Sequence, residues 1–459
     1  MYKGKDLTEV RSPQRKLIPD TVGLEHYEQT SLRGIALKAK ACKTHRFQNL
    51  YRRLDASFLM NCWQRLNKHA ASGVDKITAE IYQENLEANI QSLAERLKAK
   101  DYRAKLVRRC YIPKGNGKER PLGIPALEDR LVQTACAQLL SAIFEADFQE
   151  SSYGYRPGRS AKDAVRDLKV NFIQGKYGYV VEADIKGFFD HMEHDWILEA
   201  LKQRVDDRAF LNLIQKWLKA GILDTDGQVI HPESGTPQGG NVSPVLANVY
   251  LHFALDYWFE KRVKRHCTGE AMLVRYADDF VCAFRYLEDA KKFYQVLPQR
   301  LKKFGLDVAP EKTQLMRFSR FHPTMRNRIT FLGYEIYWFY NYKTGEARVM
   351  LRTARKKLQG ACKRIKQWIR FNRHLKGMDF ITALNRRLRG HYHYYGLPGN
   401  LKSLWRFYRN VVIYAFKWLN RRGGKRSSFT WGAFKRAIKR LGMLEPYTKR
   451  YVRQAIIFA

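Results

Sequence analysis

The nine residues VRYADDFVC, from Val274 to Cys282, most constrain how this chain can fold. Two adjacent acids, Asp278 and Asp279, interrupt an apolar run whose β-branched and aromatic residues favour a pleated, half-buried surface. Burying an ionised carboxylate is costly unless a positive group pairs with it, and two neighbouring carboxylates also repel each other. The stretch therefore predicts a hairpin that turns near Ala277 and Asp278, with a positive partner close to both acids.

The charge of the whole chain points to a polyanionic partner. Its 459 residues include 84 Lys and Arg against 44 Asp and Glu, which gives a net charge of +40. That much positive charge repels itself unless a polyanion offsets it, and nucleic acid is the polyanion we favour. An anionic membrane surface is the rival, although no uninterrupted apolar run approaches the roughly 18–20 residues of a membrane span.

Targeting and cysteine patterns indicate a cytoplasmic protein. The first 17 residues, MYKGKDLTEVRSPQRKL, contain no apolar segment and match neither a secretory signal nor a transit peptide. The seven cysteines are scattered, odd in number and never arranged as CxxC. This pattern argues against a disulfide framework and against a cysteine-based zinc site, so we expect a reducing compartment.

Positive charge is concentrated at the C-terminal end. From Leu351 onward the chain holds 28 Lys and Arg but only two acids, Asp379 and Glu445. Aromatic residues such as Trp368, Trp405 and Trp418 lie between the bases, a mixture that suits both phosphates and unstacked bases. The alternative is an ordinary helical bundle with a solvated basic face.

Helical and strand patterns mix without a regular alternation, so the predicted fold class is α+β. Helices are predicted over 84–100, 129–148 and 241–263, and again after residue 351. Strands are predicted on both sides of the Gly-rich turn in 109–125, in 177–190, in the 274–282 hairpin and in "FLGYEIYWF" and "EARVMLR".

A third acid, Asp184, ends the apolar strand of "VVEADIKGFFD". Together with Asp278 and Asp279 it would bring three carboxylates from distant parts of the chain to one point. Mg²⁺ prefers such oxygen ligands, and two such ions can stabilise the attacking and leaving oxygens of nucleotidyl transfer. Taken alone, two acids at a hairpin turn would favour an exposed turn.

The motif order gives the chain a resemblance to a known family. Seven segments resemble the successive motifs of group II intron-encoded reverse transcriptases and maturases of the bacterial type: "RPLGIP", "YGYRPGRSAKDAV", "DIKGFFD", "GTPQGGNVSPVLANVYL", "YADDF", "GLDVAPEKT" and "FLGY". The resemblance implies a right-hand polymerase of fingers, palm and thumb with a basic helical C-terminal region.

It also implies a division of the chain. Residues 1–50 would be a basic N-terminal extension and 51–345 the fingers and palm. Residues 346–425 would form the maturase-type helical thumb, which contains "LRGHYHYYG", and 426–459 a basic nucleic-acid-binding segment. With no cysteine pair after Cys362, the chain is expected to lack the HNH endonuclease that many relatives carry.

The resemblance assigns roles to individual residues. Asp184, Asp278 and Asp279 match the catalytic metal-binding triad, which would hold two Mg²⁺ ions, with Mn²⁺ as a substitute. Asp278 is expected to contact metal most directly and Asp279 to tolerate change better. Lys312 matches a lysine near the leaving pyrophosphate that could act as general acid, although a lysine after Pro-Glu is commonly just exposed.

Nucleotide and primer contacts follow in the same way. Lys114 and Arg120 match finger residues that grip the triphosphate, and Gln238 one that contacts the incoming nucleotide. Phe189 matches the bulky residue that excludes a 2′-hydroxyl, with core packing as its alternative. The primer grip would be formed by Phe331, Leu332, Gly333 and Tyr334.

The function implied is RNA-directed DNA synthesis, combined with binding of intron RNA to assist splicing and mobility by target-primed reverse transcription. The partners would be intron RNA, a DNA target or primer and dNTPs, with no membrane. Two alternatives remain: a reverse transcriptase recruited to host repair or phage defence, and an RNA-binding splicing cofactor with a vestigial polymerase site. The oligomeric state cannot be predicted from the sequence.

Overall fold

The stretch of two acids lies in a four-stranded antiparallel sheet of order β6-β7-β3-β8. The bounds of its strands are β3 Tyr179–Asp184, β6 Ala271–Tyr276, β7 Asp279–Phe284 and β8 Gln314–Arg317. Successive side chains of β3 enter two different hydrophobic cores, Val180 on one face and Val181 on the other. Because both faces of the sheet are buried, β3, β6 and β7 each contain a run of consecutive apolar residues rather than a strict alternation.

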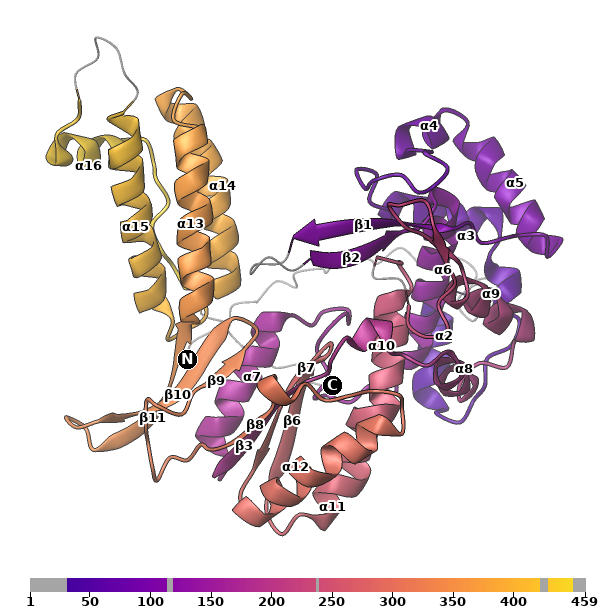
Figure 1. Cartoon of the computed structure of the whole chain (residues 1–459), viewed down its shortest axis with the longest axis horizontal. Coiled ribbons are helices and arrows are strands. Elements are labelled where there is room, and N and C mark those ends of the chain that lie inside the picture. Colours follow the sequence, from indigo (N-terminus) through magenta and orange to yellow (C-terminus); the bar gives the residue numbers. More distant parts are fainter. Residues whose placement is uncertain (1–30, 114–118, 237–238, 422–427, 449–459) are drawn as a thin grey trace, which may run out of the picture.

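Helices cover both faces of this palm sheet (Figure 1). On one face lies α7, Ala161–Gln174, and on the other α10, Ser243–Leu251, and α12, Leu287–Lys302. The helix predicted over 241–263 is confirmed, but two π-helical turns interrupt it. Further elements of this region are η2 Phe188–Asp190, α8 His194–Lys202, α9 Arg208–Leu218, the π turns η3 His252–Asp256 and η4 Phe259–Val263, α11 Lys264–His266 and η5 Pro310–Lys312.

The fingers are a helical body from which a long hairpin projects (Figure 1). Their elements are α2 Leu32–Ala41, η1 Tyr51–Arg53, α3 Ala56–Arg65, α4 Ala79–Glu84, α5 Leu86–Lys98, β1 Val107–Pro113, β2 Glu119–Ile124, α6 Leu127–Phe144, β4 Ile222–Leu223 and β5 Val229–Ile230. The strands form a sheet of order β2-β1-β4-β5. Ile35, Phe47 and Leu50 are buried in the same core as α5 and α6, so residues 31–50 pack as part of the fingers.

A second hairpin sheet connects the palm to the thumb, in the order β11-β10-β9. Its strands are β9 Ile329–Phe331, β10 Tyr334–Asn341 and β11 Glu346–Thr353. The expected boundary between residues 345 and 346 falls inside the β10–β11 hairpin, where Asn341 pairs with Glu346. We therefore place the start of the thumb after Thr353, because a domain boundary should not cut a hydrogen-bonded ladder.

The thumb is a bundle with its own hydrophobic core. Its helices are α13 Arg355–Phe371, α14 Gly377–Tyr395, α15 Leu401–Leu419 and α16 Trp431–Arg440. Leu358, Ile365 and Ile369 form an apolar stripe on α13 that is buried in this core. His391 stacks on Phe407 with ring centroids 3.9 Å apart, so packing accounts for this histidine.

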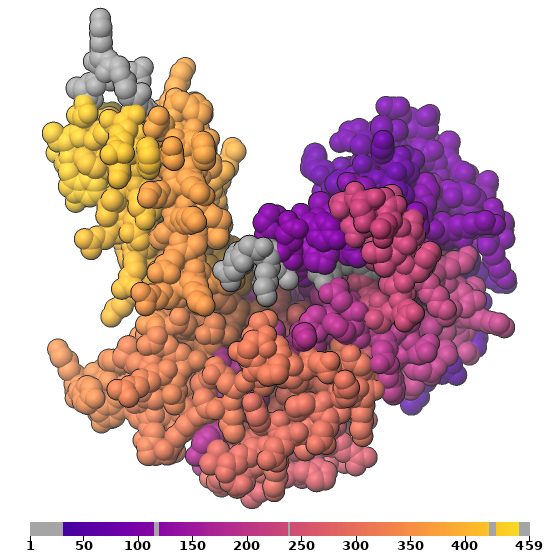
Figure 2. Space-filling model, viewed as in Figure 1, coloured from indigo at the N-terminus to yellow at the C-terminus, as the bar shows by residue number. Residues whose placement is uncertain are grey.

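These parts surround an open hollow. Figure 2 shows the surface hollowed between the thumb and the fingers, above the palm. The computed structural model describes residues 31–113, 119–236, 239–421 and 428–448. Lys114 and Gln238, both predicted to contact the nucleotide, lie outside the described residues. Within the described ranges, no helix combines the length and apolarity needed to cross a membrane.

Candidate active site

The catalytic turn predicted from the sequence is present at the end of the palm sheet. Tyr276 pairs with Asp279 across the β6–β7 hairpin, which leaves Ala277 and Asp278 as a two-residue turn. Ala277 has φ of +55°, a left-handed conformation that a residue with a side chain adopts only when its surroundings enforce it. Asp184 lies directly opposite Asp279 on the neighbouring strand, so their side chains share one face of the sheet.

The crowded acids shift one another's protonation. Burial raises the pKa of Asp279 to about 7, and the negative charges of Asp278 and Asp184 add to that rise. Burial also raises the pKa of Asp278, again reinforced by Asp184. These three carboxylates are therefore near enough to repel one another, in keeping with the strand register that places Asp184 opposite Asp279.

A lysine supplies one positive partner. Lys312, at the end of the short helix η5, donates a hydrogen bond from Nζ to Oδ2 of Asp184. This hydrogen bond raises the pKa of Lys312, so the side chain stays an ammonium ion. Its side chain is 61% exposed, which leaves it able to reach a ligand above the palm.

The acids fit a divalent metal by their donor chemistry. Carboxylate oxygens suit a hard cation such as Mg²⁺. Burial and the neighbouring carboxylates raise the pKa values of Asp278 and Asp279, and a bound cation would favour their charged forms. Across the described ranges no three His, Cys, Asp or Glu side chains are arranged to hold a metal ion. Binding would therefore require these side chains to shift, including the Asp184 carboxylate that now pairs with Lys312.

A cavity of about 810 Å³ lies between the fingers and the palm. Arg120, Phe189, Gly239 and Gly240 are among its lining residues. The positive charge of Arg120 partly offsets the rise in the pKa of Asp278, so the cavity is close to the turn that carries this acid. The structure thus brings two predicted nucleotide-contacting residues to one cavity beside the acids.

Phe189 and its neighbour Phe188 have different environments. Phe188 is 2% exposed and packs against Tyr250, with ring centroids 6.3 Å apart. Phe189 is 9% exposed and lines the cavity, and its carbonyl accepts a hydrogen bond from the backbone N–H of Thr236 at 2.8 Å. Lining the cavity makes Phe189 available for the predicted sugar contact, while its place in the same core as Phe188 leaves the core-packing alternative open.

Tyr155 is a cavity residue to which sequence analysis gave no role. It has φ of +57° and lines the same cavity as Phe189. Burial raises the pKa of its hydroxyl, and the negative charge of Asp278 contributes to the rise. A tyrosine held in a left-handed conformation at a cavity wall suggests a ligand contact, but sequence alone does not report backbone strain.

The predicted primer grip is the tight turn between β9 and β10. Phe331 pairs with Tyr334, and the two turn residues have positive φ, +50° for Leu332 and +80° for Gly333. Tyr394 of the thumb donates from its hydroxyl to the carbonyl of Leu332 at 2.9 Å. The backbone of Leu332 also lowers the pKa of Asp279 through a hydrogen bond. The turn therefore connects the thumb to the catalytic acids.

Comparison with known proteins agrees with this geometry. Residues 112–336 match the family described as reverse transcriptase (RNA-dependent DNA polymerase). The group II intron-encoded protein LtrA of Lactococcus lactis subsp. cremoris is 29% identical over 74% of this chain and 68% of its own length. Protein YkfC of Escherichia coli is 38% identical over 43% of this chain.

Two further similarities are either shorter or weaker. Nuclear intron maturase 1 of Arabidopsis thaliana is 34% identical over 21% of this chain and 13% of its own length. Apo telomerase from Candida tropicalis has a TM-score of 0.41 and 16% identity, over 61% of this chain and 62% of that chain. The chain spans about half the length of YkfC, at 52%. The family matches confirm the resemblance drawn from the ordered motifs.

Proposed function

Because the chain belongs to the group II intron-encoded reverse transcriptases and maturases, we propose that it synthesises DNA on an RNA template and binds intron RNA to assist splicing and mobility. The observation that carries the first activity is the convergence of Asp184, Asp278 and Asp279 beside a cavity that holds Arg120 and Phe189. Cytoplasm is the proposed location, in keeping with seven cysteines that form no disulfide.

The proposed mechanism distributes tasks among the residues of the site. Asp184, Asp278 and Asp279 would hold Mg²⁺, which supplies charge stabilisation at the reacting phosphate oxygens. Arg120 binds the triphosphate of the incoming dNTP, where its planar group suits phosphate oxygens. Phe189 packs under the sugar and leaves no room for a 2′-hydroxyl. Lys312, held as an ammonium by Asp184, donates a proton to the leaving pyrophosphate.

The catalytic assignment is tested by primer extension on an RNA template with Mg²⁺ and dNTPs. Asp278→Ala is expected to abolish extension, because it removes the turn carboxylate. Asp279→Asn is expected to retain a measurable rate, because an amide oxygen can still accept the hydrogen bond from the Leu332 backbone. Wild-type levels of extension by Asp278→Ala would refute the proposed activity.

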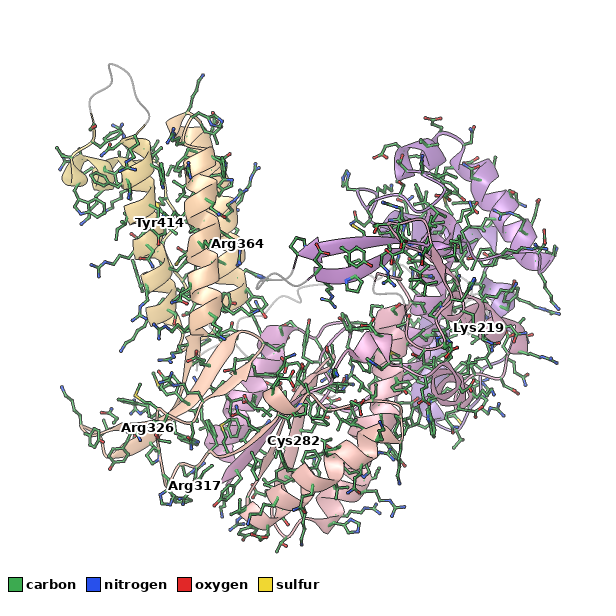
Figure 3. All side chains as sticks on the ribbon, viewed as in Figure 1. Lys219, Cys282, Arg317, Arg326, Arg364 and Tyr414 are labelled. Carbon is green, nitrogen blue, oxygen red and sulfur yellow. The ribbon has the colours of Figure 1, made fainter. Side chains whose placement is uncertain are left out.

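RNA binding is supported by a basic groove of about 770 Å³ between α13 and α15. It is lined by six cationic side chains and, among the described residues, by no acid: Arg328, Arg352, Arg355, Lys363, Lys366 and Arg406. Tyr414, marked on α15 in Figure 3, adds an aromatic ring 5.8 Å from Nζ of Lys366. Such a surface suits phosphates and unstacked bases together.

The groove lies on a different side of α13 from the primer grip. Helical residues advance by about 100° each, so Arg355, Gln359 and Lys366 share one face. Lys357 projects on roughly the opposite face, and a Cβ built on Gly333 in the primer grip would lie 3.6 Å from its side chain. We therefore propose that structured RNA occupies the groove while template and primer occupy the cleft.

A double charge reversal tests this second activity. Lys363→Glu with Lys366→Glu should weaken binding of a structured group II intron RNA and reduce the slope of log K against log salt by about 2, one unit for each lost phosphate contact. Lys261→Glu with Lys303→Glu makes the same charge change on the palm and serves as the control. Equal losses in both double variants would show a general charge effect rather than a site.

A further inference from the structure

An arginine next to the catalytic turn is completely buried. Arg275 precedes Tyr276 in β6 and is 0% exposed, as is the acid that pairs with it, Asp256. The guanidinium donates to both carboxylate oxygens of Asp256, at 2.7 Å from Nε and 2.6 Å from one terminal nitrogen. Two charges removed from water in this way are seldom a net gain over well-packed apolar residues, so stability alone is a weak reason for the pair.

The remaining N–H groups of Arg275 reach the catalytic turn and its supports. One terminal nitrogen donates to the carbonyl of Ala277 at 2.9 Å and to Oδ1 of Asn248 at 3.2 Å. The other donates to Oγ of Ser152 at 2.7 Å. A guanidinium has five N–H groups, and these contacts use all of them. Arg275 therefore has no donor left for a substrate and acts only on protein groups.

The contact with Ala277 fixes the peptide that leads into Asp278. Ala277 has the strained φ of +55°, which persists only where neighbours hold it. Behind it lies Gly154, where a Cβ would come within 2.4 Å of the Ala277 nitrogen. The side chain of Asn248 donates to the carbonyl of Gly154 at 2.6 Å. Two neighbours therefore hold the turn: Arg275 of β6 through its hydrogen bond to the Ala277 carbonyl, and Gly154 through the close approach of its backbone.

The π turn η3 brings the partners of Arg275 into line. Asn248 and Asp256 are eight residues apart, which in a regular α-helix would separate their directions by about 80°. One additional residue in the π turn reduces that separation to about 20°. Both side chains can then meet a single guanidinium, and this accounts for a rare helix geometry at this place.

We propose that Arg275 is a positioning residue of the polymerase site. It holds the Ala277–Asp278 turn in place through its hydrogen bond to the Ala277 carbonyl, while Asp256 neutralises its charge. The proposal rests on the proposed DNA synthesis. It differs from a purely structural role because it predicts a loss of rate beyond any loss of stability, and a local loosening of the turn in protein without metal.

The experiment compares two buried arginines. Arg204 is 3% exposed and donates to both oxygens of Asp147, at 2.5 and 2.6 Å, in the fingers. Arg275→Lys and Arg204→Lys each keep a charge but lose the forked geometry. We expect Arg275→Lys to lower the single-turnover rate of dNTP addition by about 100-fold, with primer–template Kd changed less than about twofold. In Arg204→Lys, neither the single-turnover rate nor the primer–template Kd should change by more than about twofold. This difference in rate should remain even if the two variants have equally lowered unfolding temperatures.

Hydrogen exchange gives a readout that does not require activity. In protein without metal, the backbone amides of residues 276–280 should exchange faster in Arg275→Lys than in wild type. In Arg204→Lys their exchange rates should equal those of wild type. Equal rate losses in both variants, or unchanged exchange at the turn, would overturn the proposal. Should Arg275→Lys fail to fold, Asn248→Ala keeps the ion pair and is expected to lower the rate by about 10-fold, the share of one supporting hydrogen bond.

The two proposals fail separately. A wild-type protein that extends no primer would refute the proposed function, whereas the exchange comparison would still decide whether Arg275 holds the turn. A wild-type protein that extends primers normally, with an Arg275→Lys variant equal to it in rate, would leave the polymerase function standing and refute the positioning role.

Discussion

At the scale of single residues, the site depends on pairs of neighbours with different environments. Phe188 and Phe189 are adjacent, equally apolar and buried in the same core, yet only Phe189 is among the residues that line the cavity. Asp278 and Asp279 are both acidic, yet Asp278 sits in the turn and Asp279 in the strand, where the Leu332 backbone hydrogen-bonds to it. Position in the hairpin therefore distinguishes residues of the same chemistry.

Phe189→Ala is expected to admit ribonucleotides. Removal of the ring opens space beside the sugar, so the preference for dNTP over rNTP should fall by about 10- to 100-fold, the range that pocket contacts of this size provide. The measurement is the ratio of kcat/KM for the two nucleotides in primer extension. Phe188→Ala is the matched control, since it removes an identical ring that does not line the cavity. An unchanged ratio in Phe189→Ala would mean that another residue discriminates the sugar.

At the scale of elements, the β9–β10 turn connects three parts of the molecule. It contacts Asp279 in the palm and Tyr394 in α14. The carbonyl of Gly333 also accepts a hydrogen bond at 2.9 Å from the backbone N–H of Ala354, the N-cap residue of α13. The positive φ of Leu332 and Gly333 belongs to the two-residue hairpin turns whose twist matches that of the flanking strands. A local change here should therefore affect how primer and thumb are held.

Gly333→Ala tests this connection. A Cβ at residue 333 would lie 2.9 Å from the hydroxyl of Tyr395 and would also require a strained φ. We expect the variant to lower thermal stability and to weaken primer–template binding by about 10-fold, equivalent to about 1.4 kcal/mol. Gly345→Ala is the control: it has φ of +68° but no atom within 4 Å of its Cβ. Equal primer–template Kd values for the two variants would show that strain alone, and not the contact with α14, matters.

At the scale of the whole molecule, the three hydrophobic cores hold a wide cleft open above the palm (Figure 2). The largest core contains residues of both the fingers and the palm, between Ile35 and Leu306, so these two parts pack as one body. The thumb core is separate and contributes helices whose outer faces are basic. Proteins built in this way can close on a nucleic acid by moving the thumb while the palm stays rigid.

Stability of the fingers and palm should fall in mild acid. Burial lowers the pKa of His252 to about 4, from an ordinary value of 6.5. The unfolded chain therefore binds a proton that the folded chain does not, and stability is lost as the pH falls from 6.5 through 4. The full shift corresponds to about 3 kcal/mol.

The free energy of unfolding, measured against pH, checks this expectation. His252→Gln cannot take up the proton, so its stability should vary less between pH 6.5 and 4 than that of wild type. His69→Gln is the control, because His69 is exposed. A variant His252→Gln with the same pH profile as wild type would contradict the assignment.

The sequence by itself determined the family resemblance, the α+β class and the strands that carry Asp184, Asp278 and Asp279, because ordered motifs and apolar runs are local properties of the chain. It also located most elements, including the helix over 241–263 and the hairpin around Ala277 and Asp278. The domain boundary at 345 falls inside the β10–β11 hairpin, because the pairing of those two strands cannot be seen in the sequence.

Only the tertiary structure decided which residues act together. Phe189 and Tyr155 meet at one cavity wall, and Lys312 reaches Asp184 across 128 residues of sequence. Sequence analysis gave Arg275 no role, yet the residue is buried against Asp256, and a π turn rotates that acid toward it. Burial, backbone strain and long-range pairing arise from packing of the whole chain, and no local pattern of residues encodes them individually.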